Sequence, residues 1–165
     1  MLSASFASAY YGTPRATQDI DLVVSGSAEQ VSTFVRLLPL HEYYADADAA
    51  VEAYRRQSLF NVIDLATGWK IDLITCKARP FSKTEFGRRR RIDLQGLPVY
   101  VTSAEDLVIA KLEWSKLAQS RRQIEDVATI LALQCSSMDR DYLEKWLTEL
   151  DLKNEWNVAA GIAGI

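Results

Sequence analysis

The stretch Arg15-Ala16-Thr17-Gln18-Asp19-Ile20-Asp21-Leu22-Val23-Val24 places two acidic residues at the start of a short apolar strand. A turn containing Gly and Pro precedes it, and its second half is rich in β-branched and large apolar side chains. Because side chains of a strand alternate between its two faces, Asp19 and Asp21 point to the same side. Two adjacent carboxylates are costly unless a positive charge lies between them, and a divalent cation with oxygen ligands is one solution. A strand entrance with two solvated acids is the equal alternative.

The composition is that of an ordinary soluble protein. Of 165 residues, 48% are hydrophobic and 25% charged, and this length favours one domain that buries about two-thirds of its chain surface. The net charge of −3 indicates no general affinity for nucleic acid. Two cysteines make no disulfide framework and indicate a reducing compartment. Since the sequence shows neither a signal peptide nor a run near the roughly 20 apolar residues of a membrane span, we expect a cytoplasmic protein.

A further acidic residue lies in a second apolar strand. Residues 58–65 and 69–75 predict two strands joined by a turn at 66–68. Asp72 has apolar neighbours on both sides and shares its face of the strand with Lys70. An isolated acid in an apolar strand needs a partner.

The remaining elements divide the chain into a sheet-rich and a helix-rich part. In the first part we expect short helices over 2–11, between Ser27 and Pro39, over 45–55 and over 80–87, and a hairpin over 88–101. The second part has capping boxes at 103–106 and 120–123, a helix starting at Asp139 and a tail of at most one turn over 155–165. The predicted organisation is a mixed-sheet core over 1–102 with a helical region, 103–165, packed on it as a single compact unit.

Two regions of the sequence resemble a known family. The motif Ser5-Phe6-Ala7-Ser8-x-x-Tyr11-Gly12-x-Pro14-Arg15-Ala16-Thr17-x-Asp19-Ile20-Asp21-Leu22 resembles the signature of nucleotidyltransferase-fold proteins. It is most similar to the abortive-infection and minimal nucleotidyltransferases of toxin–antitoxin systems. The helical half of that group is similar to Ser103-x-Glu105-Asp106-Leu107-x-x-x-Lys111-Leu112-x-Trp114 and Ser120-x-x-Gln123-x-x-Asp126. The resemblance extends from Ser5 to about Trp156 and implies an α+β fold, with a mixed sheet of the polymerase-beta-like type and a C-terminal helical part.

The same resemblance implies a chemistry. It is the metal-dependent transfer of a nucleoside monophosphate from an NTP, with Asp19, Asp21 and Asp72 as catalytic carboxylates that hold Mg²⁺ or Mn²⁺. Two metals roughly 4 Å apart can clamp the attacking and leaving oxygens of an in-line displacement. Paired acids on one strand and a third on its neighbour can supply the ligands of both.

Phosphate binding is implied for four positions: Ser5, Arg15, Thr17 and Lys111. Ser5 lies at a turn before a helix, where its hydroxyl and nearby N–H groups would hold the β and γ phosphates. Arg15 would contact the triphosphate through its fork of donors. Lys111 either reaches the phosphates or is an ordinary surface lysine.

Asp126 is expected to form a structural salt bridge rather than to take part in catalysis. Its candidate partners are Lys111 and Arg122.

The chain departs from the family pattern at the phosphate turn. It has Ala4-Ser5 where members usually have Gly-Ser after an apolar strand, and only three residues precede this point. Ala4 adds a Cβ where the backbone should approach phosphate closely. Either the triphosphate site is impaired or the chain starts downstream of its natural beginning. The strand that precedes the turn in the family would also be missing, and we therefore expect an open sheet edge that a second copy covers in a homodimer.

These observations leave three function classes. The first is an active nucleotidyltransferase whose acceptor is a protein, an RNA or a small molecule such as an aminoglycoside. The second is a catalytically degenerate member that works as a binding or regulatory module. The third is a metal-dependent nuclease that uses the same acids, against which the negative net charge argues mildly.

Overall fold

The computed structural model describes residues 1–12 and 16–165, so residues 13–15 lie outside the described part. The chain forms two units. The sheet unit comprises Met1–Ser5 and Ala16–Val101, and the helical unit comprises Phe6–Arg15 and Thr102–Ile165. Our expectation that the two parts pack into a single compact unit stays a prediction. Among the described residues, no helix combines the length and the apolarity needed to cross a membrane.

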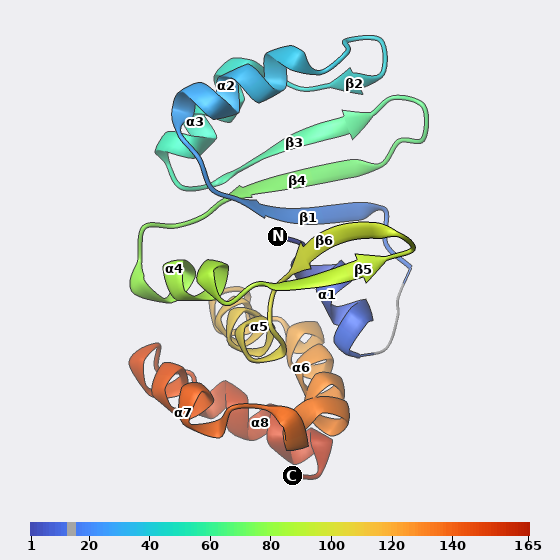
Figure 1. Cartoon of the computed structure of the whole chain (residues 1–165). Coiled ribbons are helices and arrows are strands. Elements are labelled where there is room, and N and C mark those ends of the chain that lie inside the picture. Colours follow the sequence, from blue (N-terminus) through green and yellow to red (C-terminus); the bar gives the residue numbers. More distant parts are fainter. Residues whose placement is uncertain (13–15) are drawn as a thin grey trace. The chain divides into compact units, whose positions relative to one another are not determined.

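A mixed sheet forms the centre of the sheet unit (Figure 1). Its strands are β1 (Asp19–Val24), β2 (Tyr43–Tyr44), β3 (Leu59–Asp64) and β4 (Lys70–Thr75). They lie in the order β1-β4-β3-β2, with β1 parallel to β4 and the other pairs antiparallel. The β3–β4 pair confirms the hairpin predicted over 58–75. The sequence did not predict strand β2, because two residues are too few to form a periodic pattern.

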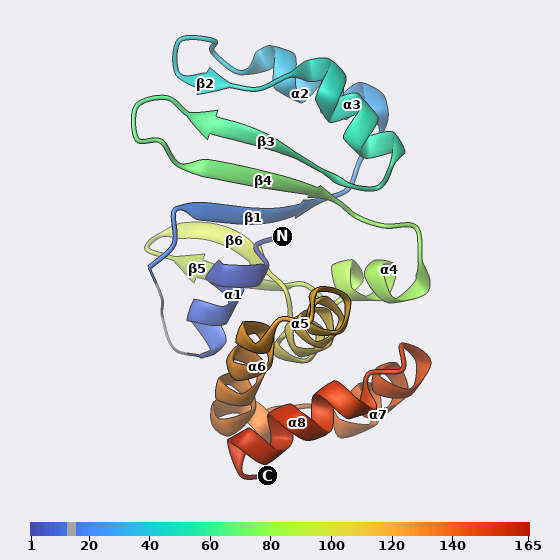
Figure 2. The ribbon, with the colours of Figure 1, turned by 180° about the vertical axis from the view of Figure 1, so that it is seen from behind.

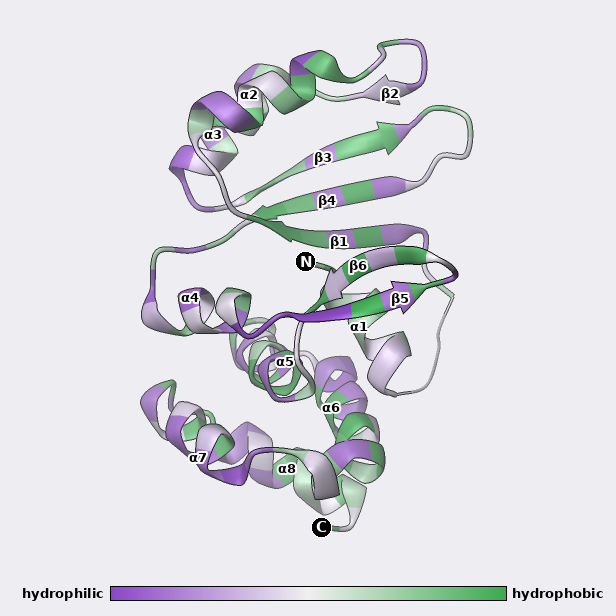
Figure 3. Cartoon of the chain, in the orientation of Figure 1, coloured by the Kyte–Doolittle hydropathy of each residue, from purple (hydrophilic) through white to green (hydrophobic). Residues whose placement is uncertain are grey.

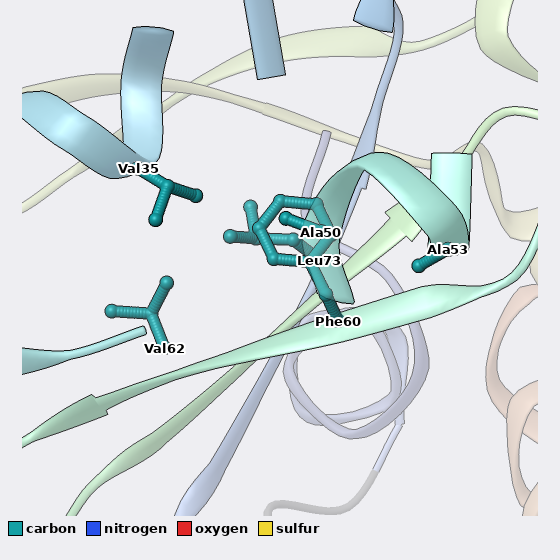
Figure 4. Close-up of a cluster of buried hydrophobic side chains, with 6 residues drawn as sticks. All are labelled: Val35, Ala50, Ala53, Phe60, Val62 and Leu73. Atoms are coloured by element: carbon teal, nitrogen blue, oxygen red, sulfur yellow. The ribbon is translucent and has the colours of Figure 1, made fainter. Parts of the chain in front are cut away.

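One face of this sheet is covered by α2 (Ala28–Leu37) and α3 (Ala47–Arg55), as Figure 4 shows. Buried side chains from both helices and from β3 and β4 form the core there: Val35, Ala50, Ala53, Phe60, Val62 and Leu73. The helices begin after Ser27 and Asp46, whose side chains accept hydrogen bonds from backbone N–H groups of the first turn. This face is therefore committed to packing, and the opposite face is the one left for polar side chains.

A second, smaller pair of strands follows in the sheet unit. After α4 (Pro80–Gly87), strands β5 (Arg90–Leu94) and β6 (Leu97–Val101) form an antiparallel hairpin. Gln95 and Gly96 make its turn with φ values of 54° and 86°, the left-handed pair that a two-residue hairpin turn requires. Both the helix start at Pro80 and this hairpin agree with the sequence expectation.

The outer edge of β1 is covered by the first residues of the chain. The N–H of Val23 donates to the Met1 carbonyl at 2.8 Å, and the N–H of Ser3 donates to the Asp21 carbonyl at 3.0 Å. Between them, the N–H of Leu2 donates to the Tyr100 carbonyl of β6 at 2.7 Å. Three residues thus replace the strand that we expected to be missing, and the expectation of an open edge is wrong.

The predicted homodimer therefore loses its structural argument, although it stays a prediction. Light scattering at micromolar concentration measures it directly, and a monomeric mass would contradict it.

The helical unit contains most of α1 together with the C-terminal helices (Figure 2). Their bounds are α1 (Ala4–Tyr11), α5 (Ala104–Ala118), α6 (Arg121–Gln134), α7 (Arg140–Glu149) and α8 (Lys153–Ala163), with a 3₁₀ turn η1 at Cys135–Ser137. The Tyr11 hydroxyl donates to the Thr102 carbonyl at 2.9 Å, and Gln134 Nε2 donates to the Tyr11 carbonyl at 3.3 Å. These two bonds attach the end of α1 to the start of α5 and the end of α6.

Two sequence expectations in this unit are wrong. The tail forms the full helix α8, because Leu152, Ala159 and Ala160 are buried and their contacts stabilise a helix whose sequence pattern is weak. The second capping box does not form, since no side chain caps α6 at Ser120. Gln123, its expected second member, instead accepts a hydrogen bond from Lys111 at 3.0 Å.

Candidate functional site

Polar side chains gather on the face of the sheet opposite α2 and α3. In the parallel pair, Asp19 lies beside Lys70 and Asp21 beside Asp72, and across the antiparallel pair Asn61 lies beside Asp72. Partners in register point to the same face of a sheet. Figure 3 shows the resulting alternation of hydrophilic and hydrophobic segments along β1 and β4. We call Asp19, Asp21 and Asp72 the carboxylate cluster.

The Lys70 ammonium lies between two members of this cluster. Its Nζ is 3.1 Å from an Asp72 carboxylate oxygen and 3.5 Å from an Asp19 carboxylate oxygen. Asp72 also accepts a hydrogen bond from the Asn61 amide. The Asp72 side chain is only 13% exposed, against 41% for Lys70 and 52% for Asp19, so the cluster opens to solvent on its Asp19 side.

Asp21 carries the clearest electrostatic signature of the site. Burial raises the pKa of its carboxyl, and the neighbouring Asp72 and Asp19 carboxylates raise this pKa further. A hydrogen bond from the Ser5 backbone N–H and the nearby Lys70 ammonium act in the opposite direction. Asp72 and Asp19 are therefore close enough to Asp21 to repel it, and a shared cation would relieve that repulsion.

The first residues of α1 bring Ser5 to this cluster. Ala4 has φ of 42°, a left-handed conformation that is costly for a residue with a Cβ. It lets the chain leave the edge of β1 and enter α1, so that the Ser5 N–H points at the Asp21 carboxylate. Strain of this kind is found preferentially at functional sites. A Gly at this position would adopt the same conformation without that steric cost.

Of the other predicted phosphate ligands in the N-terminal part, Thr17 is described and Arg15 is not. The Thr17 hydroxyl accepts from the Asp19 N–H at 3.1 Å and also contacts the Asp19 carbonyl at 3.3 Å. Thr17 thus shapes the entrance of β1 beside Asp19, while its contact with a nucleotide stays a prediction. Arg15 lies outside the described residues.

Lys111 belongs to the helical unit, where it is buried. Its side chain is 7% exposed, and its Nζ donates to Asp126 at 2.8 Å and to Gln123 at 3.0 Å. This confirms the structural salt bridge expected for Asp126 and identifies Lys111 as its partner. It also rules out the ordinary surface lysine, because the ammonium is enclosed and charge-paired.

A second buried polar network lies at the start of α5. The Ser103 hydroxyl donates to Asp106 at 2.6 Å, and the Tyr142 hydroxyl of α7 donates to the other oxygen of the same carboxylate. Asp106 is fully buried. The network ties α7 to the first turn of α5, and we interpret it as structural because its carboxylate already accepts from both sides.

The carboxylate cluster fits a divalent cation in its chemistry, since its donors are hard oxygens from adjacent strands. In the described part of the chain, however, no group of three His, Cys, Asp or Glu side chains is arranged so that it could hold a metal ion. The position of Lys70 gives a physical reason: its ammonium already lies between Asp19 and Asp72. A metal ligand set would thus have to form by displacement of an internal cation.

Sequence reasoning assigned no role to Lys70 or Asn61, the two side chains that contact Asp72. Strand periodicity did place Lys70 on the Asp72 face. Only the pairing of β4 with β1 and β3 shows that Lys70 meets Asp19 and that Asn61 meets Asp72.

Comparison with known proteins identifies the fold. The chain is similar to the crystal structure of an antigenic nucleotidyltransferase-like protein from Paracoccidioides brasiliensis, with a TM-score of 0.57 and 13% sequence identity over 98% of this chain and 82% of that one. No protein-family model matches the chain, and no curated protein does. At this identity the likeness concerns the fold alone, and it confirms the expected α+β fold of nucleotidyltransferase type.

Proposed function

We propose that the protein is a metal-dependent nucleotidyltransferase that transfers a nucleoside monophosphate from an NTP to an acceptor. One observation carries the proposal: in a nucleotidyltransferase-like fold, three carboxylates lie on the sheet face opposite α2 and α3, and two of them repel the third, Asp21. These acids lie apart from the apolar cluster that α2 and α3 form on the other face of the sheet. The resemblance to minimal and abortive-infection nucleotidyltransferases supports the same activity and suggests membership of that group.

In this proposal the carboxylate cluster holds Mg²⁺ or Mn²⁺. The metal would supply charge stabilisation to the phosphoryl group and orient the triphosphate. Asp72, which is fixed by the Asn61 amide, provides the most rigid ligand. The Ser5 turn lies beside Asp21 and offers a hydroxyl and helix N-terminal N–H groups to the β and γ phosphates. Thr17, at the entrance of β1, and Arg15 are the further residues that we propose to contact the phosphates.

We propose a structural role for Lys111 within the helical unit. Its ammonium is paired with Asp126 within the helical unit, so a direct phosphate contact would require breaking a buried ion pair. This is a revision of the role first expected from the resemblance.

A degenerate binding or regulatory module is the second candidate function. Two observations favour it, the Lys70 ammonium between Asp19 and Asp72 and the left-handed Ala4 at the phosphate turn. Such a protein would bind a nucleotide or a metal weakly and transfer nothing.

The test is incubation of the protein with each α-labelled NTP and Mg²⁺ or Mn²⁺, together with protein, RNA and aminoglycoside acceptors. We expect transfer of label that is lost in Asp19→Ala and Asp72→Ala and kept in Asp48→Ala, an exposed acid of α3. Thermal shift with each NTP provides the binding readout. Binding without transfer would support the degenerate module, and the absence of both binding and transfer in the wild type would refute the proposed activity.

A further inference from the structure

Lys70 is the side chain that most distinguishes this site from a ready-made metal centre. It comes from β4, two residues before Asp72 and directly across from Asp19 of β1. Its Nζ contacts both carboxylates, at 3.1 and 3.5 Å. A cation with oxygen ligands from both strands would have to approach the same two carboxylates.

The charges around Lys70 explain why it stays there. Asp19, Asp21 and Asp72 bring three negative charges against one positive charge. The Lys70 ammonium lies within 3.5 Å of two of these carboxylates and is the cation that offsets their charge. If the Lys70 ammonium moved away and no other cation took its place, the carboxylates of β1 and β4 would repel one another.

The surroundings of Lys70 also allow it to leave. Its side chain is 41% exposed and the neighbouring Asp19 is 52% exposed, so the ammonium can move into solvent on a flexible four-carbon stem. By contrast, Asp72 is held by Asn61 and is 13% exposed. The carboxylate would therefore stay in position while the lysine moves.

We propose that Lys70 is an internal counter-ion that competes with divalent metal for Asp19 and Asp72, and thereby sets the metal affinity of the site. This inference rests on the proposed function, since it concerns the same carboxylates. Lys70 is a positioning residue: it keeps the cluster assembled when metal is absent and lowers the affinity when metal is present.

The experiment measures Mn²⁺ binding to the full chain by electron paramagnetic resonance of free Mn²⁺, with no nucleotide. Lys70→Met is expected to bind Mn²⁺ about two- to fivefold more tightly than the wild type, where fivefold is the upper range for one partly exposed ion pair. Lys70→Arg keeps the charge and should bind like the wild type. Lys77→Met, an equal loss of charge at an exposed position after β4, serves as the matched control, and Asp72→Asn should abolish binding.

Thermal unfolding gives a second readout that does not depend on activity. In EDTA, Lys70→Met should unfold at a lower temperature than Lys77→Met, and saturating Mn²⁺ should raise its Tm by more than it raises that of the wild type. If Lys70→Met fails to fold, Lys70→Gln is used in its place. It removes the charge, keeps a hydrogen-bond donor, and is expected to show the same tighter Mn²⁺ binding.

The outcomes separate this inference from the proposed function. Equal affinity of Lys70→Met and wild type, with loss in Asp72→Asn, would overturn the role of Lys70 and leave the metal site intact. Absence of Mn²⁺ binding in every variant would overturn both. Binding by Lys70→Met but not by the wild type would support the competition and would favour the degenerate module over the active enzyme.

Discussion

The carboxylate cluster of the sheet unit and the Lys111 pair of the helical unit both join a lysine to aspartates, but they differ in balance and in exposure. Lys111 meets one carboxylate and one amide, and both members of its ion pair are nearly buried, at 7% and 13% exposure. Lys70 meets two carboxylates with a third close by, and both it and Asp19 are substantially exposed.

This difference separates a structural ion pair from a candidate binding site. A nearly buried ion pair of this kind is shielded from ligands, and the loss of one member removes a compensating charge from beside the other. An exposed cluster with excess negative charge is only partly neutralised, and a cation that binds there lowers the repulsion between its carboxylates. Charge balance and exposure, rather than residue type, thus distinguish the two lysines.

Breaking the helical pair should give the largest effect on stability. Lys111→Met removes the ammonium that lies 2.8 Å from the nearly buried Asp126 carboxylate, and we expect a loss of about 3 kcal/mol in the free energy of unfolding, measured by urea denaturation. The double variant Lys111→Met/Asp126→Leu should recover part of this loss, because an apolar pair then replaces the ion pair. A single variant as stable as the wild type would contradict the interpretation of the pair as structural.

The network at the start of α5 should respond less strongly. Tyr142→Phe removes one of the hydrogen bonds to the buried Asp106, and we expect a loss of about 1–2 kcal/mol in the same denaturation experiment. Tyr44→Phe, an exposed position in β2, is the matched control and should change stability little.

The strained turn of the sheet unit should give a gain in stability. Ala4→Gly removes the steric cost of φ at 42°, which is about 1 kcal/mol, although the greater flexibility of glycine in the unfolded chain offsets part of it. Differential scanning calorimetry should show a higher Tm for Ala4→Gly and a lower one for Ala7→Gly, a buried position in the same helix. A lower Tm for Ala4→Gly would show that the turn is unstrained.

The pH dependence of the carboxylate cluster should give the smallest effect. The pKa of Asp21 is raised on folding, so the folded state binds its proton more tightly than the unfolded state does. This contribution to the free energy of unfolding is complete below the pKa that Asp21 has in the unfolded state. It is lost as the pH rises through the pKa that Asp21 has in the folded state. In metal-free buffer, Asp21→Asn should therefore gain stability relative to the wild type between acidic and neutral pH. Parallel pH profiles for the two proteins would argue against this electrostatic account.

Much of the local structure could be predicted because it depends on short-range patterns. The alternation around Asp19 and Asp21 predicted their common face, the turn at 66–68 predicted the β3–β4 hairpin, and Ser27 and Asp139 predicted helix starts. The errors came where distant contacts override local preference. Gln123 fits a capping box by spacing, yet the buried Lys111 ammonium recruits its side chain from 12 residues away.

For the candidate site, strand periodicity is enough to predict which acids share a face of their strand, because it is a local property. The side chains that those acids contact depend instead on how the strands pair. The parallel register of β1 and β4 brings Asp21 beside Asp72 and Lys70 beside Asp19, and burial pairs Lys111 with Asp126. Strands β1 and β4 lie about 50 residues apart in the sequence, and their register depends on the core that α2 and α3 complete on the other face. No local sequence motif predicts this register.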